Sequence, residues 1–83
     1  MHDDDEYEWQ DKAFRQLRAV ASVIAEYLPL IEDHNTPVGW TFADLRDVNH
    51  ELLIALEDGD RDAAEPLLDE SRLLLTMAIK LAF

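Results

Sequence analysis

Residues 67–83 read LLDESRLLLTMAIKLAF, and this C-terminal stretch decides the expected fold. The polar residues Asp69, Arg72, Thr76 and Lys80 recur at spacings of three and four, which is the period of an α-helix. Most of the remaining positions are apolar. A surface helix keeps a polar face, whereas a helix that is apolar over most of its circumference is buried. The stretch therefore predicts a central helix, covered by the rest of the chain, by a second subunit or by a partner.

The first part of the chain predicts a long helix over about residues 6–28, preceded by a disordered acidic segment at residues 1–6 that has nothing to bury. Pro29 disfavours helix at the residue before it, so the regular helix is expected to end near Leu28. Apolar residues in this segment alternate at spacings of three and four, which is typical of the seam of a bundle helix. This seam comprises Phe14, Leu17, Ala21, Ile24, Leu28 and Ile31, and it is widened on one side by Ala13, Val20, Val23 and Tyr27.

A second helix is predicted over about residues 42–57, after a loop from Glu32 to Trp40, with Thr41 as its N-terminal cap. Asn49 falls on its apolar seam. It is either a buried polar residue that sets the register or a boundary residue, and we favour the boundary. Trp40 either caps the core, which we favour, or is an exposed anchor for a partner. The buried stripe of this helix is expected to contain Phe42, Leu45, Val48, Leu52, Leu53 and Leu56.

Gly59 is expected to end the second helix, and the short link that follows predicts an antiparallel hairpin with a third helix over about residues 62–82. If Asp62 caps the third helix, Pro66 lies in its first turn and does little harm. If Asp60 caps it instead, Pro66 should bend the helix. The predicted fold class is all-α: a small up-down-up three-helix bundle that forms a single domain over residues 7–83.

The size of the chain predicts that a second copy completes the core. Eighty-three residues are near the lower limit for a domain that folds alone, and such domains often need disulfides, metals or oligomerisation. The chain has no cysteine, which excludes disulfides and thiolate metal sites. Self-association, most simply as a homodimer, is the stabiliser that remains. The core and intersubunit surface is expected to include Leu74, Leu75, Ala78, Leu81 and Phe83.

The charge of the chain predicts a basic partner. Nineteen acidic residues against seven basic ones give a net charge of −12, and residues 1–11 contribute half of it. Nucleic acid and anionic membranes require positive surface, so direct binding to either is disfavoured. A bias of the source organism or a need for solubility would explain the acidity equally well. The acids expected to contact a partner are Asp3, Asp4, Asp5, Glu6, Glu8, Asp44, Asp47 and Glu51.

The sequence contains no recognisable catalytic, cofactor-binding or metal-binding constellation. It lacks a glycine-rich phosphate loop, and its serines have no nearby histidine in sequence. Asp47 and His50 share a helical face, but a di-metal bundle site would need a second such pair. The acidic start is unlike a secretory signal, and the apolar C-terminal run is too short to span a bilayer. We therefore expect a cytoplasmic protein that is not an enzyme.

These observations predict a small acidic protein–protein interaction protein that acts as an inhibitor or antagonist of a basic partner. It would be of the antitoxin, immunity or phage type. Carboxylates spaced along a helix can stand in for backbone phosphates, so mimicry of nucleic acid is one mechanism for it. The alternative is a self-associating structural or accessory subunit whose acidity only provides solubility.

Overall fold

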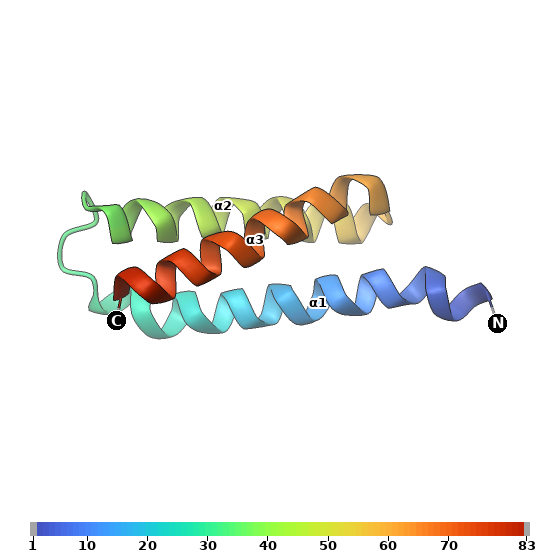
Figure 1. Cartoon of the computed structure of the whole chain (residues 1–83), viewed down its shortest axis with the longest axis horizontal. Coiled ribbons are helices and arrows are strands. Elements are labelled where there is room, and N and C mark those ends of the chain that lie inside the picture. The colour runs from blue at the N-terminus through green and yellow to red at the C-terminus, as the bar shows by residue number, and fades with distance from the viewer. Residues whose placement is uncertain (1, 83) are drawn as a thin grey trace.

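The protein is an all-α molecule in which three helices pack against one another, as predicted (Figure 1). The computed structural model describes the backbone of residues 2–82 and the side chains of residues 8–82. Helix α1 spans His2–Tyr27 and continues into a short 3-10 turn, η1, at Leu28–Leu30. Helix α2 spans Pro37–Asp58, and α3 spans Arg61–Ala82. The expectation of disorder over residues 1–6 stays a prediction.

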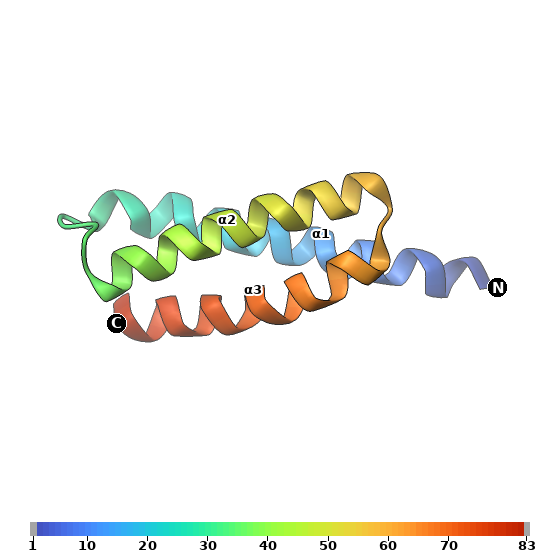
Figure 2. The same cartoon turned by 90° about the horizontal axis from the view of Figure 1, so that it is seen from above.

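The arrangement of the helices leaves different segments at the two ends of an elongated molecule of 48 × 17 × 17 Å. Figure 1 shows the N-terminus and the link between α2 and α3 toward one end, with η1, the loop after it and the C-terminus at the other. Seen from above, α2 and α3 lie side by side in front of α1 (Figure 2). No helix within residues 2–82 is long and apolar enough to cross a membrane.

Helix α2 begins five residues earlier than predicted, because its cap is Thr36 and not Thr41. The Thr36 hydroxyl accepts a hydrogen bond from the backbone N–H of Gly39 at 3.3 Å. Pro37 follows at the first helical position, where its missing N–H costs nothing and its fixed φ suits the helix. Thr41 lies inside the helix, and its hydroxyl donates to the carbonyl of Pro37 at 2.8 Å. The prediction missed that a threonine followed by proline is itself a helix start.

The link between α2 and α3 settles which residue caps α3. Gly59 adopts a positive φ of 69° and ends α2 as predicted. The carboxylate of Asp60 accepts a hydrogen bond from the N–H of Ala63 at 3.1 Å, so Asp60 is the cap and the alternative with Asp62 is wrong. Pro66 therefore lies beyond the first turn of α3. In Figure 2 the orange part of α3 is inclined to the red part, as expected for a proline within a helix.

The core consists of two apolar clusters with polar contacts between helices near the middle of the bundle. Ser71 of α3 is fully buried and accepts a hydrogen bond from the amide of Gln16 at 3.1 Å. The amide of half-buried Asn49 donates to the carbonyl of Leu17 at 3.4 Å. The first cluster contains Trp9, Ala13, Leu17, Leu52, Ala55, Ala64 and Leu68, and the second contains Val20, Phe42, Leu45 and Ala78.

The buried side of α1 is turned relative to the predicted seam. Phe14 is 51% exposed and Ala21 is also exposed, so both were wrongly assigned to the core. Trp9 is only 8% exposed and packs with Ala13 and Leu17. The core-facing side of α1 is therefore centred on the side of Ala13 and Val20, which was expected only to widen the seam. On α2, Leu53 is 39% exposed and was likewise wrongly placed in the buried stripe.

Helix α3 is not covered around its circumference by the described part of its own chain, so cover by the rest of the chain is wrong, and cover by a second subunit or a partner stays a prediction. Its buried side is formed by Ala64, Leu68, Ser71 and Ala78. Leu74 and Leu75 are half-buried against the second cluster, whereas Phe83 lies outside the described residues. The large apolar side chains that α3 leaves exposed are Leu73, Met77, Ile79 and Leu81.

Candidate partner-binding surface

Three of the predicted partner-binding acids lie on one side of α2. Asp44, Asp47 and Glu51 follow one another at spacings of three and four residues, so their side chains share a helical face. All three are exposed. Among the described side chains, the ion pairs involve other acids, and none reaches these three. The face therefore carries three negative charges that are not compensated by a paired base.

An exposed apolar row runs along α3. Leu73, Met77 and Leu81 follow one another at four-residue spacing and are 62%, 43% and 49% exposed. The side of α3 toward α1 carries Glu65, Leu68, Asp69 and Arg72, which line a groove with α1. Leu81 instead lines a hollow with residues of α2. The row therefore turns along α3. Leu73 follows Asp69 by four residues on the outer side of the helix, and Leu81 reaches the end hollow that residues of η1 and α2 also line.

The acidic row of α2 and the apolar row of α3 lie at the same level along the bundle. Leu45 and Ala78 pack in the same core cluster. Asp44 and Met77 precede them by one residue, so these two side chains lie at about the same height along the bundle axis. The outer surface over the two helices is thus acidic on the α2 side and apolar on the α3 side. We call this surface the α2–α3 face, and it comprises Asp44, Asp47, Glu51, Leu73, Met77 and Leu81.

Trp40 is on the surface, so the interpretation that it caps the core is wrong. Its side chain is 54% exposed, and its indole N–H donates to the side-chain carbonyl of Asn35 at 3.2 Å. It precedes Asp44 by four residues and begins the same side of α2. An exposed tryptophan held by a hydrogen bond suits a partner contact, because such residues often dominate interface energetics.

A hollow of about 560 Å³ opens at the end of the bundle where α3 terminates. Its described lining comes from the end of α1, η1, the following loop, the start of α2 and the end of α3. The charged lining residues are Glu32 and Asp33, and no base is among them. Leu81 belongs both to this hollow and to the α2–α3 face, so the two apolar surfaces are continuous. The apolar part of the lining includes Tyr27, Leu30, Ile31, Val38, Phe42, Leu81 and Ala82.

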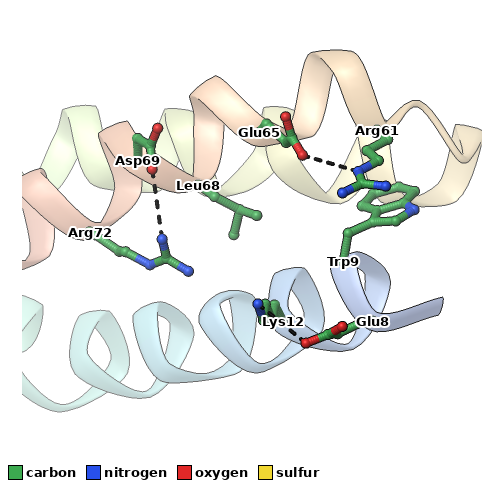
Figure 3. A pocket seen from close by; sticks show the side chains of 8 residues that line it. All are labelled: Glu8, Trp9, Lys12, Arg61, Glu65, Leu68, Asp69 and Arg72. Atoms are coloured by element: carbon green, nitrogen blue, oxygen red, sulfur yellow. Dashed lines mark hydrogen bonds and ion pairs between the residues drawn. The ribbon is translucent and has the colours of Figure 1, made fainter. Parts of the chain in front are cut away.

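A second groove lies between α1 and α3, and it is lined by Trp9 of α1 and Leu68 of α3 (Figure 3). Its rim carries three acids and three bases, which pair within their own helices. Lys12 contacts Glu8 at 3.5 Å on α1, and the α3 pairs Arg61–Glu65 and Arg72–Asp69 measure 3.0 and 3.7 Å. The rim is therefore neutral and self-compensated, and it has no excess charge with which to attract a partner.

The structure does not bring Glu8, the N-terminal partner-binding acid whose side chain it describes, to the acidic row of α2. Glu8 is paired with Lys12 at the groove between α1 and α3. Its neighbour Trp9 packs with Ala55 and Ala64, in the cluster near the α2–α3 link and away from Asp44. The side chains of Asp3, Asp4, Asp5 and Glu6 lie outside the described residues.

The histidines and acids of α2 do not assemble a metal site. Asp47, His50 and Glu51 are all exposed and line a shallow surface depression with Arg46. Within the described part of the chain, no group of three or more His, Cys, Asp or Glu side chains is placed to hold a metal ion.

The apolar half of the α2–α3 face was in the sequence but was assigned to the core. Leu81 was predicted as a self-association residue, whereas Leu73 and Met77 were counted only as part of a buried helix. Glu70 and Ser71 precede Leu73 in the stretch of residues 67–83. Glu70 is exposed and Ser71 is buried, so these two polar residues were the signal that α3 has a buried side and an outer side. Comparison of the chain with protein-family models, with curated proteins and with solved structures gives no match.

Proposed function

We propose that this chain is a small interaction protein that binds a partner with a basic surface and acts as its inhibitor or antagonist. The observation that carries the proposal is the set of exposed, unpaired carboxylates of Asp44, Asp47 and Glu51 on one side of α2. Opposite charges across an interface steer the encounter and fix its orientation. Mimicry of a nucleic-acid backbone by these carboxylates is one form of this function, and we expect the protein to act in the cytoplasm without a cofactor.

Charge placement supports a binding role over a purely solubilising one. Acids that serve only solubility can lie anywhere on the surface. Several acids of α1 and α3 pair with a base on the same helix, so their charge is locally neutralised. The acids of the α2 row are unpaired, as are exposed acids elsewhere such as Glu26 and Glu57, but they share one helical face with the exposed Trp40. An interface combines apolar anchors at its centre with charged residues at its rim.

The test is a pair of charge-neutralised variants that each remove three acids. Asp44→Asn/Asp47→Asn/Glu51→Gln removes the acidic row, and Asp11→Asn/Glu26→Gln/Glu57→Gln removes three exposed acids from other surfaces. Binding to a helical peptide of alternating lysine and alanine blocks is measured by fluorescence anisotropy at low salt. We expect the first variant to weaken binding at least about tenfold, which corresponds to ~1.4 kcal/mol, and the control to weaken it much less.

Equal weakening by both variants would show that the peptide senses only the total charge of −12, and the proposal of a binding face on α2 would then fail. Circular dichroism of both variants checks that the helices are intact. All six positions are exposed, so neither variant removes a core contact.

Self-association is the second candidate function, and the exposed row Leu73, Met77 and Leu81 favours it. Apolar patches of this kind mark interaction sites on soluble proteins. In this case the chain would be a homodimeric structural or accessory subunit, and its acidity would only keep it soluble.

A further inference from the structure

We infer that the α2–α3 face, together with the adjoining end hollow, is the docking site for an amphipathic basic helix of the partner. This inference rests on the proposed function and deepens it, because it names the surface and the chemical class of the bound segment. The bound helix would place an apolar stripe on α3 and its lysine or arginine side chains against α2. Helix-in-groove recognition of this kind is read out by anchors at i, i+3, i+4 and i+7.

The apolar half of the site is long enough for a helix. Leu81 follows Leu73 by eight positions along α3, a rise of roughly 12 Å at ~1.5 Å per residue. Leu81 leads directly into the end hollow of about 560 Å³, where Phe42 and Tyr27 contribute apolar walls. A partner helix of about four turns would cover the row and place one bulky apolar side chain at the hollow.

The charges on the α2 side of this apolar surface are mainly negative, and the base among them is Arg46, which shares a depression with Asp47 and Glu51. Asp44, Asp47 and Glu51 border the row, and Glu32 and Asp33 line the hollow. A helix lying on the apolar row would therefore have carboxylates along one flank and at one end. Two bases adjoin the row in sequence: Arg72, which is next to Leu73 and pairs with Asp69, and Lys80, which is next to Leu81. A partner with lysine or arginine beside its apolar stripe complements this pattern.

A second copy of the chain is a poorer occupant of the same face. A symmetric dimer packs the same patch of both copies against each other. Where the two-fold axis brings the α2 helices together, the acidic rows of two chains, each with a net charge of −12, would approach across one interface. Like charges facing each other across an interface cost several kcal/mol. A basic segment meets the same acids with the opposite sign.

The experiment compares two designed peptides of equal length and charge. The first carries leucines at i, i+3, i+4 and i+7 with lysines beside them, and the second has alanine in place of each leucine. We expect the leucine peptide to bind the wild-type chain at least about tenfold more tightly than the alanine peptide. A third peptide, with glutamate in place of each lysine, should not bind.

Two variants of the protein locate the contact. Leu73→Ser/Met77→Ser should remove the advantage of the leucine peptide and leave the binding of the alanine peptide unchanged. Phe14→Ser is the matched control, because Phe14 is about as exposed as Leu73 and Met77 but lies on α1. The control should keep the full advantage. Both proteins should retain wild-type helicity, since every changed side chain is exposed.

The outcomes separate this inference from the proposed function. If the alanine peptide binds through the acidic row and leucine adds nothing, the inference is overturned and the proposed function stands. The inference is also overturned if Phe14→Ser removes the advantage as fully as Leu73→Ser/Met77→Ser does. If neither lysine peptide binds, both are overturned. If the glutamate peptide binds as well as the lysine peptide, the site is only apolar, and the basic partner is wrong.

Discussion

Gly39 shows how a single residue fixes the approach of the loop to α2. A Cβ added at this position would lie 2.6 Å from the carbonyl carbon of His34 and closer still to the carbonyl oxygen, both of which are backbone atoms. Backbone cannot move aside as a flexible side chain can, so Gly39→Ala should lower the free energy of unfolding by roughly 1–3 kcal/mol. The measurement is the thermal midpoint, which should fall by several degrees.

The second glycine is the control for this prediction. Gly59 has a φ of 69°, but nothing lies within 4 Å of an added Cβ. Asparagine tolerates the left-handed region, so Gly59→Asn should change the midpoint much less than Gly39→Ala does. A Gly39→Ala protein as stable as the wild type would show that the loop does not need this close contact.

Asn49 is a polar residue that the bundle satisfies only in part. Its amide nitrogen donates to the carbonyl of Leu17 at a long 3.4 Å, and its buried side-chain oxygen has no hydrogen-bond partner. A buried group without a partner costs free energy, so Asn49→Leu should stabilise the protein by about 1 kcal/mol in chemical denaturation. Lower stability of the leucine variant would mean that the contact with Leu17 outweighs the unsatisfied oxygen.

At the scale of the elements, the sequence predicted what depends on local chemistry. The three helices and the Gly59 stop follow from spacing and turn residues. The start of α2 was missed because Thr36 and Pro37 were assigned to a loop. The burial of Trp9 and the exposure of Phe14 were missed because both lie on apolar sides of α1, and only packing against α2 and α3 decides between them. The same limit applied to Leu73 and Met77, whose exposure depends on which side of α3 the other helices cover.

Pro66 weakens α3 within its own length. It has no N–H to donate to the carbonyl of Asp62, four residues earlier, and it is exposed. Pro66→Ala restores that hydrogen bond and should raise the free energy of unfolding by roughly 1–3 kcal/mol. Circular dichroism during urea denaturation measures the change. An unchanged or lower midpoint would show that the bend is needed to seat Ala64 and Leu68 against α1.

For the whole molecule, the dominant long-range electrostatic contribution to stability is the repulsion among its acidic side chains. The chain carries a net charge of −12, and the acids of the α2 row have no pairing base. Added salt screens repulsion between exposed charges, with a Debye length that falls to ~3 Å at 1 M. The thermal midpoint should therefore rise between about 0.05 M and about 1 M sodium chloride. The Asp44→Asn/Asp47→Asn/Glu51→Gln variant should start higher and rise less. A midpoint that falls with salt would mean that the intrahelical ion pairs outweigh the repulsion.

The solution mass tests whether the outer side of α3 is left for a partner. Phe42, Leu45 and Leu52 are each less than 2% exposed within one chain, so the core is largely closed without a second copy. We expect a folded monomer by light scattering at low salt, because like-charged chains repel and the face suits a basic segment. A dimer at low and high salt that dissociates in Leu73→Ser/Met77→Ser but persists in Phe14→Ser would instead assign the face to self-association. In that case the acidic exterior would be the surface left for another protein, and the apolar row would be part of a dimer core.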